Sequence, residues 1–459
     1  MGEIDVVAQL SAEVAGPDME QPVVRWHPLV RMGFRFGFAF LGAGMTGGWL
    51  ATALIRSFGV PQETVAELTK WTGLYPLTDR VGKHIFHTTV DYTRSGSGDT
   101  AAQWISAFTW LLAAFAATAV WSVLDRHRPN YARLNAWFRL LLRGALVSAL
   151  LLYGMVKLLP SQMTFVLQRL VEPFGDMSPM SVLWTQTALS EPYEIALGAA
   201  EITAALLLIA PLTAGLGSIL AFIVTLQVAL LNLTFDVPVK IFSLQLLAFA
   251  AVLAAPDIRR TVRALLGRAI PRREPELRFT TGRRNRILLA AQLIFGGWLF
   301  YTALTEGLDG WHTYGNARAQ SPLYGIWNVT EYSVAGQQLP ALVDFRESTR
   351  SGLPNASDRF RRIIFDIPDA ITVQRMDDSL LPLPARIDTA GHTITIPRDA
   401  TGGAPLAAFD YEQPQPNRLI LIGQLAGHPI RMRLELIPLD HYPAVSRGFH
   451  WVQAEPYMR

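Results

Sequence analysis

The sequence predicts an integral membrane protein in which a bundle of about seven transmembrane helices precedes an all-β carboxyl-terminal domain. Half of the 459 residues are hydrophobic and only 17% are charged, whereas an ordinary soluble domain has about 25% charged residues. The apolar residues gather in stretches of about 18 to 25, which is the length that a helix needs to cross a bilayer. The last third of the chain instead has an ordinary soluble composition and contains segments that alternate polar with apolar residues, as half-buried strands do.

Seven apolar stretches account for the predicted bundle. They are Gly33–Ile55, Ala102–Leu124, Leu140–Leu159, Tyr193–Ala210, Ala214–Leu233, Ile241–Ala255 and Ile287–Leu304. The sixth is short for a span, and Asp99 or Thr100 is placed to cap the second. We therefore expect a transmembrane domain over residues 33–305 and a β-rich domain over residues 321–459.

The amino-terminal residues 1–32 are expected to form a disordered or amphipathic tail. The first 20 of them are polar and acidic, with no basic segment before an apolar run, so we expect no cleaved signal peptide.

Charge in the connecting segments predicts the orientation. Segments 125–139 and 257–286 are rich in arginine and fall on the same side of a seven-span chain, whereas segment 160–192 on the other side has Arg169 as its one basic residue. Basic loops face the cytoplasm. The amino terminus should then be cytoplasmic, and the β-rich domain should lie on the periplasmic or extracellular face of the plasma (inner) membrane. The 56–101 loop carries five basic residues on the outside, but long loops cross largely regardless of charge.

Composition also excludes some functions. The chain has no cysteine, which excludes disulfides, thiolate metal ligands and thiol redox chemistry by its own side chains. The net charge of +3 comes with arginines that cluster beside the apolar stretches. The expected partner of these arginines is the lipid bilayer and not a nucleic acid.

In the β-rich domain, short strand candidates are separated by glycine and proline, which suggests a meander that closes on itself. They are Ile326–Tyr332, Arg362–Asp366, Ala370–Arg375, Thr393–Pro397, Ala407–Tyr411, Leu419–Gly423 and Arg431–Leu436, with a hairpin turn expected at Ala426-Gly427. The run Gly325-Ile326-Trp327 is similar to the Gly-x-Trp signature of lipocalin barrels. A tryptophan that fills the end of any small barrel explains it equally well.

Ionisable residues within or beside the predicted spans form the first candidate site, because charges in a bilayer are costly and need partners. Glu201 lies in the fourth span and Lys157 ends the third, while Asp236 and Lys240 flank the turn between the fifth and sixth. Glu191 and Glu194 open the fourth span. Apart from Glu201, we expect these residues to meet near the outer interface. The alternative is that the lysines reach the headgroups and the carboxylates only pair with them for packing.

The second candidate cluster lies in the first outer loop. His84 and His87 are three residues apart and Asp91 follows four later, so all three would share one face of a helix. Such a group can bind zinc or iron or pass a proton. The metalloprotease pattern His-Glu-x-x-His is missing. We therefore assign no metal site, and His84 and His87 remain the candidate ligands. The alternative is that they are ordinary interfacial histidines.

Around Tyr153–Pro160 the chain resembles the DoxX-like membrane family. The matching features are Gly154-x-x-Lys157-Leu158, the glutamate-bearing helix at Ala199-Ala200-Glu201 and a tight hairpin through Pro211. The resemblance implies a four-helix core over about residues 139–256. Four runs outside or beside this core resemble a larger bacterial subgroup with a carboxyl-terminal β domain. They are Gly82-Lys83-His84, Arg128–Arg133, Asp236–Lys240 and Arg447–Trp451. The wider family is linked to quinone-coupled sulfur oxidation, redox-partner complexes and cargo handling in membranes. The resemblance does not decide whether this chain is an enzyme.

Three hypotheses about function follow. In the first, the protein is a quinone- or lipid-linked redox-associated component with its site at the outer face. His84, His87 and Asp91 would then pass protons, and a bundle pocket would be lined by Lys157, Glu201, Asp236 and Lys240. In the second, it binds or transports a lipid or other apolar ligand. In the third, it is a scaffold whose β domain holds a periplasmic or membrane protein partner.

Overall fold

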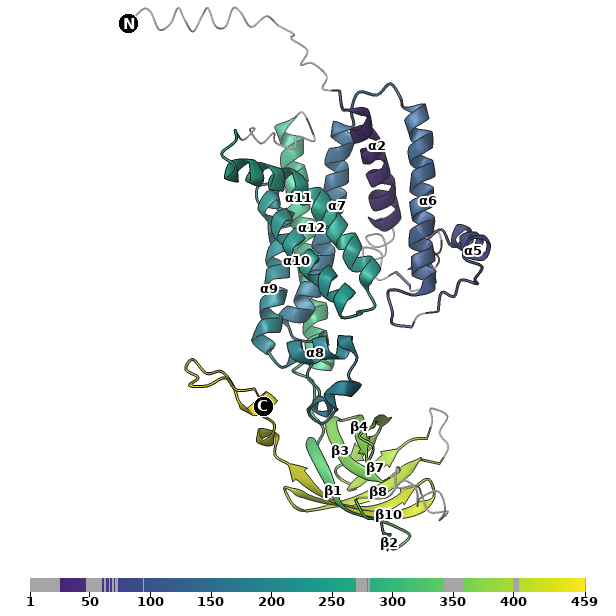
Figure 1. Ribbon diagram of the computed structural model, residues 1–459, viewed down its shortest axis with the longest axis vertical. Helices are drawn as coiled ribbons and strands as arrows, with labels where there is room; N and C mark the ends of the chain where they lie inside the picture. The colour runs from purple at the N-terminus through teal and green to yellow at the C-terminus, as the bar shows by residue number, and fades with distance from the viewer. Residues whose placement is uncertain are drawn as a thin grey trace, which may run out of the picture. The chain divides into compact units, whose positions relative to one another are not determined.

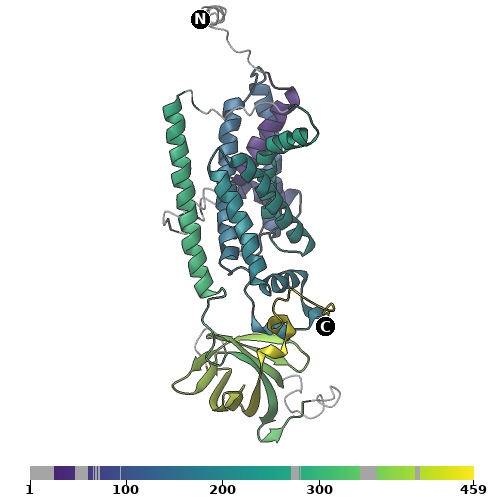
Figure 2. The same ribbon diagram turned by 90° about the vertical axis from the view of Figure 1, so that its left-hand side faces the viewer.

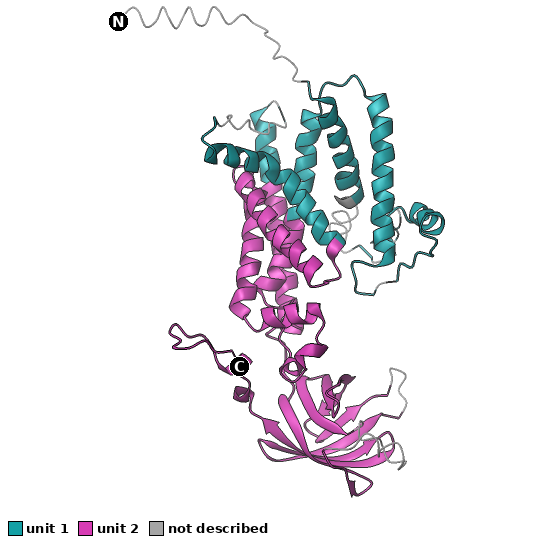
Figure 3. Ribbon diagram, in the orientation of Figure 1, with its two compact units in different colours: residues 1–146, 241–290 teal, residues 147–240, 291–459 magenta. Residues whose placement is uncertain are grey.

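The computed structural model describes residues 25–46, 60–61, 63–65, 67, 70, 73–93, 95–269, 279, 281–341, 359–398 and 404–458. Residues 1–24 of the predicted tail and 47–55 of the first predicted span lie outside this set. The chain forms two compact units (Figure 3). Unit 1 comprises residues 1–146 and 241–290, and unit 2 comprises residues 147–240 and 291–459.

Six helices in the described part of the chain are long and apolar enough to cross a membrane (Figure 1). They are α6 (Ala101–Leu124), α7 (Ala132–Leu158), α9 (Glu191–Ile209), α10 (Ala214–Thr234), α11 (Lys240–Leu265) and α12 (Gly282–Thr313). Each overlaps one of the predicted spans, which makes this a multi-pass membrane protein. The sixth predicted span belongs to a helix of 26 residues, because α11 continues through Pro256 into the arginine-bearing polar residues 257–265.

The described residues of unit 1 also form the shorter elements α2 (Pro28–Gly37), the π-helical η1 (Phe38–Thr46) and α5 (Tyr75–His84). A buried arginine of α2 holds this part of the unit together. Arg35 donates hydrogen bonds to Tyr131 Oη, Ser122 Oγ and the carbonyl of Asp125, each at 2.9 Å. The ring of Phe34 stacks on Tyr131 with centroids 5.1 Å apart. At the amino-terminal end of α6, Thr100 caps the helix in a capping box with Gln103.

The helical part of unit 2 is built on close backbone contact. A Cβ added to Gly198 of α9 would lie 2.4 Å from the backbone nitrogen of Leu158, and one added to Gly217 of α10 would lie 2.8 Å from Leu208 N. Gly296 and Gly307 of α12 approach side chains of α9 and α7 in the same way. Small residues at helix crossings are typical of membrane bundles, where packing and not water exclusion drives association. Two short 3-10 helices, η2 (Leu167–Leu170) and η3 (Phe174–Asp176), and α8 (Pro179–Ala188) connect α7 to α9.

The carboxyl-terminal part of unit 2 is a nearly closed antiparallel barrel (Figures 1 and 2). Its strands are β1 (Gly325–Val334), β2 (Gln337–Gln338), β3 (Phe360–Ile367), β4 (Ala370–Arg375), β5 (Leu380–Pro384), β6 (Arg386–Asp388), β7 (Thr393–Ile396), β8 (Ala407–Gln415), β9 (Arg418–Leu425) and β10 (His428–Ile437). The order is β5-β4-β3-β1-β10-β9-β8-β7-β6, with β2 paired to β1. The first and last long strands pair from Ile326–Ile437 to Val334–Ile430. The two edge strands, β5 and β6, are consecutive in the sequence, with Ala385 as the one residue between them.

Side chains fill the interior of the barrel. Trp327 of β1 is 1% exposed, and its Nε1 donates to the carbonyl of Leu323 at 2.9 Å. Buried apolar residues from every long strand surround it. After the barrel, a short 3-10 helix η5 (Leu439–His441) and α13 (Pro443–Ser446) carry the chain back towards the helical part of unit 2. The barrel is therefore a packed core.

Candidate functional site

Lys157 and Glu201 form a buried ion pair between α7 and α9 in unit 2. Lys157 Nζ lies 2.9 and 3.0 Å from the two carboxylate oxygens of Glu201, and it also donates to the carbonyl of Tyr153 at 3.3 Å. The two residues are 6% and 4% exposed. The pair forms because Gly154 and Gly198 let the two helices approach closely, one turn from Lys157 and Glu201 respectively.

A second buried carboxylate belongs to the same cluster. Glu194 lies two turns before Glu201 on α9 and is 1% exposed. It accepts a hydrogen bond from the backbone N–H of Met163 at 3.2 Å. Lys157 is close enough to attract it electrostatically. The ammonium of Lys157 thus attracts two buried carboxylates, Glu194 and Glu201. A buried carboxylate without a cation of its own destabilises the fold. The cluster therefore contains one more carboxylate than ammonium groups.

Asp236 and Lys240 form a different kind of pair. Lys240 Nζ lies 2.8 Å from Asp236 Oδ1, but the Asp236 side chain is 81% exposed. Asp236 has a φ of 53°, in the left-handed turn between α10 and α11, and Lys240 also donates to the carbonyl of Val237 at 3.3 Å. This exposed pair closes a turn between two helices. That Asp236 and Lys240 line a bundle pocket together with Lys157 and Glu201 stays a prediction.

His84, His87 and Asp91 lie in unit 1, and all three are exposed. The expectation that they share one helical face is wrong, because α5 ends at His84 and His87 has a φ of 53°. The chain folds back here since Gly82 leaves room for Val90, and a Cβ on Gly82 would lie 2.5 Å from that side chain. Hydrogen bonds from the hydroxyl and the N–H of Thr93 lower the pKa of Asp91. Among the residues whose placement is described, no three His, Asp or Glu side chains gather as metal ligands.

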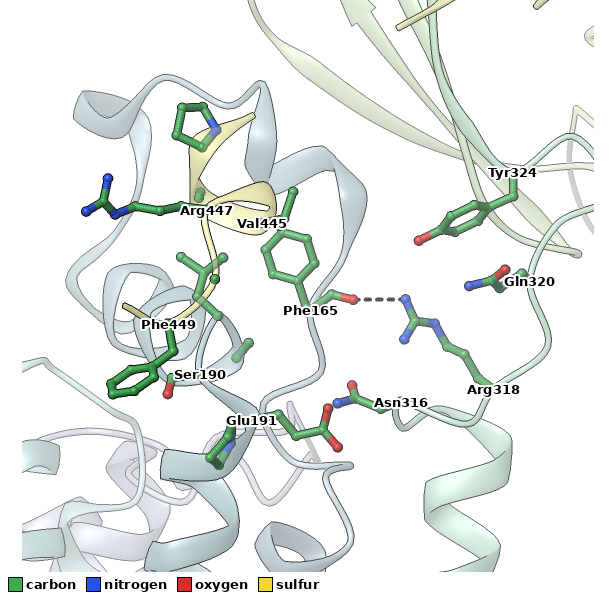
Figure 4. A pocket seen from close by; sticks show the side chains of 16 residues that line it. Phe165, Ser190, Glu191, Asn316, Arg318, Gln320, Tyr324, Val445, Arg447 and Phe449 are labelled. Atoms are coloured by element: carbon green, nitrogen blue, oxygen red, sulfur yellow. Dashed lines mark hydrogen bonds between the residues drawn. The ribbon is translucent and has the colours of Figure 1, made fainter. Parts of the chain in front are cut away.

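A pocket of about 800 Å³ lies at the amino-terminal end of α9, entirely within unit 2 (Figure 4). Four segments contribute to its wall: Phe165, the α8–α9 connection Ala188–Pro192, the segment after α12 with Asn316, Arg318, Gln320 and Tyr324, and the carboxyl-terminal residues Pro443–Val445 and Arg447–Phe449. Charged groups and aromatic rings therefore face the same space. Glu191 in this wall is one helical turn from the buried Glu194.

The wall is fixed by contacts between the barrel and the connection from α7 to α8. Arg318 Nη2 donates to the carbonyl of Phe165 at 2.9 Å and to both oxygens of Asp366 at 3.0 and 3.1 Å. Burial raises the pKa of Asp366, although Arg318 opposes this shift. Gln168 accepts from Thr372 of β4 at 3.0 Å. These contacts attach strands β3 and β4 to the segment around η2.

Sequence reasoning missed this pocket and the residues that shape it. Arg318 lies in a loop after a predicted span, and Asp366 is one polar residue in a predicted strand, so neither is marked by a motif or by periodicity. The one usable signal was Glu191 at the start of the fourth span. Arg447, Gly448 and Phe449 also supply part of the wall, and no motif marks them as such.

Comparison with known proteins gives one similarity. No family model matches the chain, and no solved structure matches it. The uncharacterised protein YwoB of Bacillus subtilis (strain 168) is 31% identical over 96 residues, which cover 19% of this chain and 62% of that protein. The chain thus matches less than two thirds of that relative's length.

Proposed function

We propose that this protein is a multi-pass protein of the plasma (inner) membrane that binds an amphiphilic molecule, a lipid or a quinone, in the pocket at the outer end of α9. The observation that carries the proposal is the mixed wall of this pocket at the start of a membrane-spanning helix. Its volume of about 800 Å³ falls within the range of roughly 300–1,000 Å³ typical of small-molecule sites.

The wall suits an amphiphile because its polar and apolar groups are both present. Glu191, Asn316 and Gln320 offer donors and acceptors to a headgroup, while Phe165 and Tyr324 offer apolar surface to a chain or ring. The packed interior of the barrel leaves this pocket as the better place for such a ligand. In this account the barrel serves as a support for the wall.

The proposal includes a finer architecture. A seventh span over Gly33–Ile55 is supported by α2 and η1, which follow each other without a break. A lipocalin-like barrel is supported by Trp327 in β1 and by the pairing of β1 with β10. A cytoplasmic amino terminus and an outer-face β domain are supported by the arginine-rich segments 125–139 and 257–286. Membership of the DoxX-like family is proposed on the sequence motifs around Lys157 and Glu201 and on the hairpin through Pro211.

A second candidate function is redox chemistry on a quinone, and the buried cluster of Lys157, Glu201 and Glu194 favours it. Reduction of a quinone takes two electrons and two protons. A redox partner protein would supply the electrons, and carboxylic acid groups within reach of the ring would supply the protons. Glu191 lines the pocket, and Glu194 lies one turn further into the same helix. The proton-passing role of His84, His87 and Asp91 stays a prediction. So does the third hypothesis, a scaffold that holds a protein partner through its β domain.

The experiment is mass spectrometry of an organic extract from the purified protein, with a control membrane protein from the same cells. A matched pair of variants locates the ligand. Ala444→Trp places a large side chain in the pocket wall, whereas Ala408→Trp places it on the exposed face of β8. An enriched lipid or quinone that Ala444→Trp loses and Ala408→Trp retains supports the proposal. Enriched quinone favours the redox function. A ligand retained by both variants, or no enrichment, contradicts the pocket assignment and favours the scaffold.

A further inference from the structure

The carboxyl-terminal segment 449–458, here called the tail loop, exposes large apolar side chains. Phe449 is 77% exposed, Trp451 91%, Val452 87% and Met458 92%. Single exposed apolar residues are common on protein surfaces, but several in one short segment mark an interaction site. The loop has a defined local structure, because Arg447 donates to Gln453 Oε1 at 2.9 Å and its guanidinium lies 4.1 Å from the ring centroid of Tyr457.

The place of the tail loop indicates what covers it. Phe449, its first residue, lines the pocket together with Ser190 and Glu191, the residues at which the spanning helix α9 begins (Figure 4). Tyr193 in the first turn of α9 is also a half-exposed aromatic residue, at 44%. The tail loop therefore lies next to the point where the chain enters the bilayer.

The residue types of the tail loop match a position at the membrane interface. Tryptophan and tyrosine concentrate where a bilayer meets water, since their rings prefer the headgroup region. Arg447 and His450 add groups that can meet lipid phosphates. We infer that the tail loop inserts Phe449, Trp451 and Val452 into the lipid interface beside α9, and so anchors one wall of the pocket to the membrane surface. This inference depends on the membrane position of α9 and not on which ligand fills the pocket.

The cysteine-free chain allows a direct test. Val452→Cys supplies one thiol for a nitroxide spin label and leaves Phe449 and Trp451 in place. The labelled protein is reconstituted in vesicles of phosphatidylcholine and phosphatidylglycerol. Power saturation then compares collision with oxygen, which concentrates in lipid, and with a water-soluble nickel chelate. The matched control is Ile422→Cys on the exposed face of β9, where the original side chain is 42% exposed.

The expected result is that oxygen relaxes the Val452→Cys label more than nickel does, with the reverse order at Ile422→Cys. Adding Phe449→Ser and Trp451→Ser to the Val452→Cys chain should move its label towards the nickel-accessible pattern of the control. The inference is overturned if the two labels show the same accessibility. It is also overturned if the Val452→Cys label is shielded from both reagents, because a protein partner would then cover the tail loop.

Discussion

Replacing Lys157 by methionine should strongly destabilise the helical part of unit 2. The change keeps the length of the side chain but removes the ammonium that lies 2.9 and 3.0 Å from the Glu201 oxygens. Glu201 and Glu194 then remain buried without a cation. Breaking a buried ion pair from one side costs about 3–5 kcal/mol. We expect a loss of that size in the free energy of unfolding, measured in mixed micelles of a mild detergent and dodecyl sulfate.

Two further variants identify the cause of that loss. Lys240→Met removes the same group from a pair whose carboxylate, Asp236, is 81% exposed, and such a pair contributes about 0–1 kcal/mol. The double variant Lys157→Met with Glu201→Leu removes both charges of the buried pair and leaves only Glu194 buried without a cation, so it should recover part of the stability lost in the single variant. The reasoning is refuted if Lys157→Met and Lys240→Met cost the same, or if the double variant is as unstable as the single one.

Three other predictions use the same unfolding measurement or its pH dependence. Trp327→Ala should cost about 3–5 kcal/mol, because it empties the packed end of the barrel, and a loss below 1 kcal/mol would contradict the filled interior. Gly198→Ala should cost about 1–3 kcal/mol by forcing α9 away from α7. Gly297→Ala should be tolerated, because no atom lies within 4 Å of a Cβ added there. Burial raises the pKa of Asp366 above the value of about 3.9 in an unfolded chain. Between these two pKa values the folded chain therefore binds more protons than the unfolded chain. The free energy of unfolding should therefore fall as the pH rises through the pKa of folded Asp366. Asp366→Asn should flatten this dependence, and an unchanged slope would refute it.

The helical part of the fold could be predicted from the sequence because the length of an apolar stretch is a local property. Six predicted spans overlap the six apolar helices, and Thr100 caps α6 as its position suggested. The ends were less predictable. α11 extends past Pro256 since a helix with packed neighbours tolerates a proline and an exposed polar turn.

Strands could likewise be predicted where a local pattern marks them, and were missed where only their place in the sheet explains them. The alternation in Arg431–Leu436 predicted β10, and the turn at Ala426-Gly427 is present with positive φ at both residues. β5 was missed because its Pro382 and Pro384 argue against a strand. Its edge position resolves this, since a proline is tolerated where its missing N–H faces away from the sheet.

The site was only partly predictable for a physical reason. The cost of burying Lys157 and Glu201 marks both residues as candidates in an apolar stretch. Their ion pair was not predicted, because the cluster expected at the outer interface left Glu201 out. The helical face proposed for His84 and His87 failed because a contact between Gly82 and Val90 turns the chain. The pocket wall joins four segments that are distant in sequence, and no periodic pattern connects Phe165 with the residues after α12 or with the wall residues between Pro443 and Phe449.

Native mass spectrometry of the protein released from lipid nanodiscs tests the central claim most directly. The account predicts one tightly held lipid or quinone mass per chain. It predicts that this mass is lost in Ala444→Trp, where the pocket is filled, and kept in Ala408→Trp. A chain that carries no retained mass, or a mass that both variants keep, would contradict the claim that the pocket at the start of α9 binds an amphiphile.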